Sequence, residues 1–500
     1  MMYRAHGVVP ALASLASIPF LLACGPAGST ADAEDAAADA ADSLDAAEEA
    51  EEFVCNSPPG EEFADDRFYH PWAVLPSSEV PVSRDWQLRR GIIHIHSPYS
   101  HDACDNEPFT DGVRNEECFQ QLRQALCDTG QDFAFLTDHA TLFADNEYPD
   151  VLLFAPGDTL IERDGVPVAN RMACPDGREV ILAAGTETGT MPIGLEHHVG
   201  ATPEERHAAY DDTSPAGIEA LKAAGAVALV EHTEGWTVEE LLGMPLDGFE
   251  IYNLHFNLED GIAEAINLIA ELRRAPCRVP VPELGLVPIW RENDADLLRW
   301  SKALTVRRSV GILATDVHRN TFDATSLDGE RIDSFRRLTH WFSNYVLLPA
   351  GDVDDVALKD AIRHGRLYGG FDYLGYPVGF DFHAEGAGTI YEMGDEVPAG
   401  ESVVLRVVAP TVSRLDPDGP QPVITARILR SDDGTWTEVA TGEGTVELPA
   451  APSGVYRAEV RIVPEHLRPW LGSRADTYVV DRAWVYSNPI YVGVTWPPSP

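Results

Sequence analysis

Short apolar runs alternate with amphipathic segments between residues 91 and 318 of the chain. The apolar runs are GIIHIH, DFAFLTDH, EVILAAGTE, HHVGA, AVALVEH, GFEIYN and GILATDVH. Helical periodicity fills several of the gaps between them, as in ECFQQLRQALCDTG, AGIEALKAAGA and EDGIAEAINLIAELRRA. Strands that alternate with helices are typical of βαβ units and a mostly parallel sheet, and this many runs favour a seven-stranded α/β barrel over an open sheet. A helix in VALKDAIRHGRLYG ends the region near residue 370.

The pattern changes to a period of two beyond about residue 375. The segments ESVVLRVVAP, PVITARILRSDDGTWTEVA, GVYRAEVRIV and TYVVDRAWVYSNPIYVGV alternate apolar and polar positions between Gly, Asp and Pro turns. This pattern predicts a small antiparallel β-sandwich over residues 375–500. It has no clustered ligand-type residues, so we expect an accessory domain. The expected order along the chain is therefore a lead-in segment over residues 53–90, an α/β barrel over 91–372 and then this β-sandwich.

An apolar run near the N-terminus, VVPALASLASIPFLLA, follows Arg4 and leads into a cysteine. The run is too short to span a bilayer comfortably and is typical of a signal peptide, here residues 1–23. Its end, LLAC, resembles a bacterial lipobox and predicts lipidation of Cys24; an ordinary secretory signal and a short anchor helix are the alternatives. In each case we expect the protein to be exported, and because Gly25 is not an aspartate we expect anchoring to the outer rather than the inner membrane. Residues 24–52 are rich in alanine and acidic residues and predict a mobile tether.

The charge balance of the chain is strongly acidic. It has 81 acidic and 36 basic residues, for a formal net charge of −45. Such a balance argues against binding nucleic acid or an anionic bilayer surface. Membrane contact is therefore expected through the N-terminal lipid alone. The charge also suits cation binding, although most of these carboxylates must be solvated surface.

The cysteines leave their own chemistry open. Of the seven in the chain, lipidation of Cys24 leaves six. An even number in an exported chain is compatible with disulfides, but the sequence does not decide among the many pairings. Free buried thiols are an equally good interpretation, because a large domain needs no covalent cross-link. None of the cysteines has C-x-x-C spacing, so we do not expect a cysteine-based zinc or redox site.

Metal-ligand side chains stand at the C-terminal ends of nearly all the predicted barrel strands, where functional groups gather in such folds. They are His94, His96, His101, Asp102, His139, Glu187, His197, His198, His232, Glu250, Asp316 and His318. The H-x-H spacing places two imidazoles on one side of a strand, as a chelate for one divalent ion. The D-x-H spacing repeats this arrangement with a carboxylate. Burial of so many imidazoles without a metal would be costly unless each found a partner.

In order along the chain, the motifs HIHSPYSHD, LTDH, GTE, HHVG, EHT and TDVH resemble those of the PHP (polymerase and histidinol phosphatase) superfamily. The resemblance covers roughly residues 91–370. It implies a distorted seven-stranded α/β barrel and a cluster of two or three divalent ions, Zn, Mn or Fe. The implied ligands are His94, His96, Glu187 and Asp316 for one ion, Glu187, His198 and His232 for a second, and His139, His318 and a donor from the first motif for a third.

Two positions in these motifs offer a choice of residue. His101 and Asp102 both qualify as the third donor of the first motif, and we prefer His101. In EHHVG the family pattern favours His198 over its neighbour. Asp138 and Glu250 are expected to orient the ligands rather than to bind metal, although a solvated carboxylate at the barrel rim explains Glu250 almost as well.

Clustered divalent ions indicate a hydrolase, and hydrolysis of a small-molecule phosphate ester fits them best. Two nearby cations activate a water near neutral pH and stabilise the phosphoryl oxygens in the transition state. Arg319, directly after the D-x-H motif, is the first candidate to hold the substrate, and Arg171 is the second. Either is also typical of a surface salt bridge. His255 in YNLHFN is a candidate proton donor to the leaving group, and a rim histidine is the alternative.

Two other functions are compatible with these motifs. Some exported PHP relatives with a C-terminal β module, which SNPIYV resembles, look like metal-dependent hydrolases of carbamates or esters. A protein that keeps the fold but only binds its ligand is the third hypothesis. No serine elbow, P-loop or dinucleotide fingerprint offers a rival nucleophile or cofactor.

Overall fold

The computed structural model describes residues 67–82, 84–261, 263, 264, 267, 281–321, 325, 326, 328–494 and 496. The predicted signal peptide, Cys24 and the acidic tether lie outside the described residues, as do Cys55, Cys277 and most of the predicted helix EDGIAEAINLIAELRRA. Among the described helices, none has the length and apolar character needed to cross a bilayer.

Six of the seven predicted runs form strands. They are β1 (Trp86–Ile95), β4 (Phe133–Leu136), β7 (Glu179–Gly185), β9 (Val227–Leu229), β10 (Gly248–Asn253) and β11 (Val310–Ala314). Strands β1, β4 and β7 pair in parallel, and so do β10 and β11. The prediction of a mixed α/β fold is confirmed.

The remaining run, HHVGA, does not form a strand, so this prediction was wrong. The strand in this part of the chain is β8, Met191–Leu195, which lies just upstream and pairs antiparallel with both β7 and β9. Pro192 and Gly194 weaken the β pattern of MPIGL in the sequence. All five residues of β8 are buried, so tertiary packing overrides that local preference.

Backbone hydrogen bonds also join β9 to β10 and β11 to β1. The amide of Val230 donates to the carbonyl of Gly248 at 3.3 Å, which joins the end of β9 to β10. The amide of Asp316 donates to the carbonyl of His94 at 2.8 Å, which joins the end of β11 to β1. One buried cluster gathers alternate side chains of β1, β4, β7, β8, β9 and β11, including Ile93 and Phe135. Helix α12 (Asp355–His364) packs against β7, β9, β11 and β12 (Ser343–Pro349).

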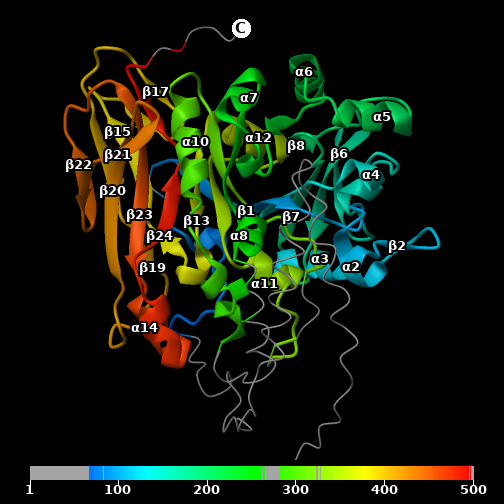
Figure 1. Ribbon diagram of the computed structural model, residues 1–500, viewed down its shortest axis with the longest axis horizontal. Helices are drawn as coiled ribbons and strands as arrows, with labels where there is room; N and C mark the ends of the chain where they lie inside the picture. Colours follow the sequence, from blue (N-terminus) through cyan, green and yellow to red (C-terminus); the bar gives the residue numbers. More distant parts are fainter. Residues whose placement is uncertain are drawn as a thin grey trace, which may run out of the picture. The chain divides into compact units, whose positions relative to one another are not determined.

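The same sheet extends from the other edge of β1 into the C-terminal part of the chain. The antiparallel order continues through β12, β13 (Leu367–Gly370), β24 (Arg482–Ser487) and β23 (Gly454–Val463). Strand β23 pairs with β20 (Val423–Asp432), which pairs with β21 (Thr435–Gly442). The strands β15 (Asp381–Glu385), β16 (Ile390–Glu392), β18 (Val404–Val408) and β22 (Thr445–Leu448) form a separate antiparallel sheet. Figure 1 shows these C-terminal strands on the opposite side of the fold from α5 and α6.

The other elements are short or lie at the periphery. The remaining helices are α2 (Ala103–Asn106), α3 (Glu116–Asp128), α4 (Ala140–Phe143), α5 (Pro203–Tyr210), α6 (Pro215–Ala223), α7 (Val238–Gly243), α8 (Leu254–Asp260), α10 (Asp294–Leu304), α11 (Phe335–Thr339), α13 (Arg468–Leu471) and α14 (Ala475–Tyr478). The remaining strands are β2 (Phe109–Thr110), β3 (Val113–Arg114), β5 (Thr159–Arg163), β6 (Val166–Ala173), β14 (Pro377–Val378), β17 (Glu396–Val397), β19 (Thr411–Val412) and β25 (Ile490–Val492). The helices predicted from ECFQQLRQALCDTG, AGIEALKAAGA and VALKDAIRHGRLYG are α3, α6 and α12.

Two disulfides resolve part of the cysteine question. One joins Cys104 to Cys118, with their Cα atoms 5.7 Å apart, and the other joins Cys127 to Cys174 at 5.6 Å. Both bridges start or end on α3 and tie it to neighbouring segments of the chain. These four cysteines are therefore not free thiols.

A buried histidine in the C-terminal part makes stability depend on pH. His466 is 4% exposed, and burial lowers its pKa to about 4, although a hydrogen bond from its Nε2 to the carbonyl of Leu374 opposes that shift. The unfolded chain takes up this proton at about pH 6.5, so stability is complete above that pH and falls as pH drops toward about 4, by at most about 3 kcal/mol. In chelator-treated protein, the melting temperature of His466→Gln should fall less than that of the wild type between about pH 7 and pH 5. Parallel calorimetric profiles of the two proteins would contradict this assignment.

Candidate metal centre

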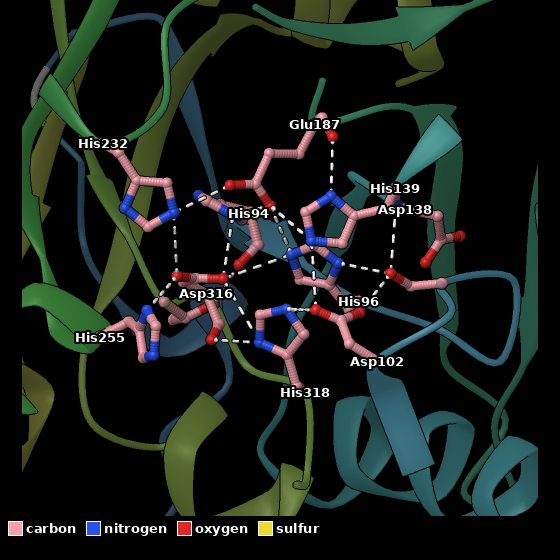
Figure 2. A network of polar contacts seen from close by, with 12 residues as sticks. His94, His96, Asp102, Asp138, His139, Glu187, His232, His255, Asp316 and His318 are labelled. Carbon is pink, nitrogen blue, oxygen red and sulfur yellow. Dashed lines mark hydrogen bonds and ion pairs between the residues drawn. The ribbon is translucent and has the colours of Figure 1, made fainter. Parts of the chain in front are cut away.

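Ten polar side chains from different strand ends converge on one small volume, which Figure 2 shows from close by. The residues labelled there are His94, His96, Asp102, Asp138, His139, Glu187, His232, His255, Asp316 and His318. They follow or end β1, β4, β7, β9, β10 and β11. Because the C-terminal ends of neighbouring parallel strands meet at one edge, motifs that are far apart in the sequence come together here.

The first group of donors contains four fully or nearly buried residues: His94, His96, Glu187 and Asp316. Oε2 of Glu187 lies 3.1 Å from Nε2 of His94 and 2.9 Å from Nε2 of His96. Oδ1 of Asp316 lies 3.1 Å and 3.3 Å from the same two nitrogens. Two imidazoles and two carboxylates thus surround one point, and they are the four ligands that the sequence motifs imply for one ion.

A second group lies on the other side of the same two carboxylates. Nε2 of His232 is 2.8 Å from Oε1 of Glu187 and 3.5 Å from Oδ2 of Asp316. Nδ1 of His255 is 3.0 Å from Oδ2 of Asp316. Glu187 and Asp316 each present one oxygen to the first group and one to the second, so both are placed to bridge two ions.

A third group gathers around Asp102. Its Oδ2 lies 3.2 Å from Nε2 of His139 and 3.0 Å from Nε2 of His318. His96 stacks on His318 with ring centroids 3.7 Å apart, and Nε2 of His139 lies 3.8 Å from Oε2 of Glu187. The third group therefore shares Glu187 with the first.

The directions of these donors indicate a common target rather than contacts with one another. Nε2 of His96, Nε2 of His318 and both carboxylate oxygens of Asp316 are buried yet make no hydrogen bond. Imidazole nitrogens or carboxylate oxygens of the other clustered residues lie 2.9–3.5 Å from these atoms. Buried polar atoms are normally satisfied, and lone pairs that point past each other toward a shared point are typical of ligands for a cation. The side chains present fit a cluster of divalent ions.

The electrostatics of the cluster favour ionised carboxylates. Burial opposes the charge on Glu187, but the imidazoles of His94 and His139 outweigh it and hold its pKa well below the usual range. Burial likewise opposes the charge on Asp316, and His94, His255 and His318 hold its pKa well below the usual range. Both bridging residues are therefore in the anionic form that a divalent cation requires.

Three of the clustered residues have strained backbones. The φ angles of His94, His232 and Asp316 are 69°, 45° and 51°, in the left-handed region that residues with a side chain seldom adopt. A bulge between Ile93 and Ile95 in the β1–β4 pairing accompanies the turn at His94. Such strain concentrates at functional sites, where the surrounding fold holds it in place. It aims these side chains inward at the ends of their strands.

Hydrogen bonds from outside the three groups hold several ligands in place. Glu250 is 1% exposed, and its carboxylate contacts Nδ1 of His94 and accepts from the amide of His232 and the side chain of Asn253. Asp138 accepts from both the amide and the hydroxyl of Ser97. Glu250 thus contacts ligand residues directly, whereas Asp138 orders the turn that follows His96.

Two residues predicted as ligands do not join the cluster. His198 lies in the loop after β8, and its ring nitrogens contact the hydroxyl of Tyr210 and the carbonyl of Asn146, both at 2.8 Å. His101 is exposed and packs beside His139, with ring centroids 5.0 Å apart, while its neighbour Asp102 faces the ligands. The upstream position of β8 explains the first difference. The second arises because the hydroxyl of Ser100 donates to Oδ1 of Asp102 and turns Oδ2 inward.

Other predicted residues lie beside the cluster or away from it. His255 is part of the second group and also lines a pocket next to it, together with Arg319. Arg171 instead donates to the carbonyl of Val353 and lies 3.8 Å from Glu179. Sequence reasoning missed Glu234, whose Oε1 lies 3.2 Å from Nδ1 of His232. The H-x-E spacing is its only signal in the sequence.

Comparison with solved structures finds distant neighbours, two of which follow. No family model matches the sequence, and no curated protein matches it. A two-domain protein from Bacteroides vulgatus that contains a predicted PHP-like metal-dependent phosphoesterase is 12% identical, covers 78% of this chain and 94% of its own, and gives a TM-score of 0.33. PsfC from Pseudomonas syringae is 13% identical, covers 55% of this chain and 88% of its own, and gives a TM-score of 0.26.

Proposed function

We propose that this chain is a metal-dependent phosphoesterase with a PHP-type barrel. The observation that carries the proposal is the convergence of imidazoles on two shared carboxylates, those of Glu187 and Asp316, whose oxygens face separate groups of histidines. A structural role alone does not explain buried ligand atoms that lack hydrogen bonds. Bound divalent ions supply an activated water near neutral pH and positive charge opposite the phosphoryl oxygens.

The proposed ligand sets follow the three groups. His94, His96, Glu187 and Asp316 would hold the first ion, His232 and His255 with the two bridging carboxylates the second, and Asp102, His139 and His318 the third. Compared with the motif-based assignment, His255 replaces His198 and Asp102 replaces His101. Both replacements keep a nitrogen or oxygen donor at each ion, which zinc and manganese accept.

The chain's own residues supply two further roles. Arg319 lines the pocket beside Asp316 and His318, and its guanidinium lies 3.7 Å from the carboxylate of Asp105. It is placed to bind phosphoryl oxygens, which a planar guanidinium contacts with two donors. His255 borders the same pocket, so it is also placed to protonate a leaving group when the second ion is carried by the remaining ligands.

The barrel completes this proposal at the level of the fold. In the order β1–β4–β7–β8–β9–β10–β11, each strand is bonded to the next and the last returns to the first. We take this as a distorted seven-stranded barrel whose interior is the cluster around Ile93 and Phe135. The antiparallel β8 and the short β9 supply the distortion.

Export with a lipid anchor on Cys24 remains part of the proposal. The two disulfides, Cys104–Cys118 and Cys127–Cys174, support the export, because such bonds persist in oxidising compartments outside the cytosol.

The proposal is tested on purified protein that is stripped with a chelator and reloaded with Mn²⁺ or Zn²⁺. We expect two or three ions per chain and metal-dependent hydrolysis of p-nitrophenyl phosphate or its bis-ester. A panel with an aryl carbamate tests the alternative hydrolase, which would cleave that substrate and leave the phosphates intact. A metal-loaded protein that cleaves none of them would be a binding protein instead.

A further inference from the structure

An apolar pocket adjoins the metal centre. It is partly open to solvent. Its wall includes Leu254, Leu258, Leu286, Ile289, Ile332 and Leu338, and its polar edge includes His255, Asp316 and His318. Figure 2 shows these last three side by side at one flank of the cluster. A group bound in the pocket would therefore lie next to the bridging carboxylate Asp316.

The polar groups of the pocket are already engaged or face the metal centre. Asp333, which also lines the pocket, accepts hydrogen bonds from the amide of Thr321 and from Arg331. Asp316, His255 and His318 belong to the ligand groups. Arg319 carries a positive charge that suits an anion. The wall thus offers few partners to the hydroxyl groups of a sugar or a polyol.

We propose that this pocket receives the non-reacting part of the substrate and that this part is apolar, as in an aryl or branched alkyl phosphate. The inference rests on the proposed function, because it needs the phosphoryl group to sit at the cluster and Arg319. An apolar group gains free energy on leaving water in proportion to its buried area. A hydroxylated group in the same place would lose its hydrogen bonds to water without replacement.

Non-hydrolysable phosphonates separate the pocket from the chemistry. Binding of inorganic phosphate, benzylphosphonate and 2,3-dihydroxypropylphosphonate to the metal-loaded protein is measured by calorimetry. We expect benzylphosphonate to bind about tenfold or more tightly than the dihydroxypropyl compound. Equal affinities for the two phosphonates would overturn the apolar pocket alone. Failure of the metal-loaded protein to bind phosphate or either phosphonate would overturn the proposed function and this inference together.

A matched pair of leucine variants places the effect in the pocket. Leu338 is half-buried in the pocket wall, whereas Leu242, on α7, is half-buried in the core but does not line the pocket. Leu338→Asn should weaken benzylphosphonate binding about tenfold and leave the dihydroxypropyl compound and the metal content unchanged. Leu242→Asn should change neither affinity. Loss of benzyl preference in both variants, or in neither, would contradict the assignment.

Discussion

Asp316→Asn is expected to lose at least one metal ion and to reduce phosphoesterase activity by about 10³-fold or more. Oδ1 of Asp316 faces His94 and His96, and Oδ2 faces His232 and His255, so one substitution removes the negative charge from two groups at once. Asparagine keeps the shape of the side chain but offers only one oxygen, and that oxygen is neutral. Metal content measured by mass spectrometry, together with kcat/KM, tests this expectation.

Asp372→Asn is the matched control for this variant. Asp372 is also buried, but it accepts hydrogen bonds from the hydroxyls of Ser343 and Tyr345 and is not one of the clustered ligands. The Asp372→Asn variant should retain its metal ions. In the same experiment, His198→Gln should also keep full metal content, because the structure ties His198 to Tyr210 and Asn146. If Asp316→Asn retained all its metal, or if His198→Gln lost an ion, the ligand sets proposed here would be wrong.

The strand ends could be predicted because two independent patterns coincide there. Apolar runs such as DFAFL and GILA mark β4 and β11, and polar ligand-type residues follow each of them directly. A strand buried on both faces is apolar, so a polar residue directly after it marks the strand end. The order of the motifs therefore located His94, His96, His139, Glu187, His232, Asp316 and His318, all of which the structure brings together.

What the sequence could not provide is the exact turn after each strand. Asp102 and His101 are adjacent and chemically alike as ligands, and only the hydrogen bond from Ser100 decides which side chain faces inward. The family pattern in EHHVG favours His198, but the strand forms upstream in MPIGL, where burial compensates for Pro192 and Gly194. The entry of His255 into the cluster depends on the start of α8, which side-chain periodicity does not fix.

The continuity of the main sheet was also beyond the sequence. Periodicity alone separates an α/β part from an all-β part near residue 375, and it contains no information on which edges pair. In the structure β13 pairs with β24, so β1 and the C-terminal strands share one sheet. Such pairing depends on contacts between residues more than a hundred positions apart, such as Gly369 and Tyr486.

The loop that carries Asp102 is strained, and a disulfide anchors it. Cys104, Asp105 and Asn106 have φ angles of 60°, 62° and 63°, a run of left-handed residues with side chains that costs about 1–2 kcal/mol per residue. The amide of Cys104 donates to the carbonyl of His318, and its sulfur is bonded to Cys118 on α3. Without the bridge, this loop would lower its free energy by moving away from His318. The disulfide therefore holds the loop in its strained conformation.

The double variant Cys104→Ser/Cys118→Ser is therefore expected to lose the ion held by Asp102, His139 and His318 while it keeps the ion held by His94 and His96. Activity should fall by about 10–100-fold, the usual effect of a misplaced group that supports a metal site. Metal analysis and kcat/KM of the purified variant test this result.

Cys127→Ser/Cys174→Ser provides the comparison, since it removes the other disulfide from the same helix. Cys127 lies near the C-terminus of α3, and Cys174 directly follows β6. Neither cysteine is adjacent in sequence to a clustered ligand. Its loss should lower the melting temperature without changing the metal content. Equal loss of metal in both double variants would mean that the bridges only stabilise the fold, because general loosening does not select one ion. Selective loss in the first variant alone requires that the Cys104–Cys118 bridge hold Asp102 against the strain of its own loop.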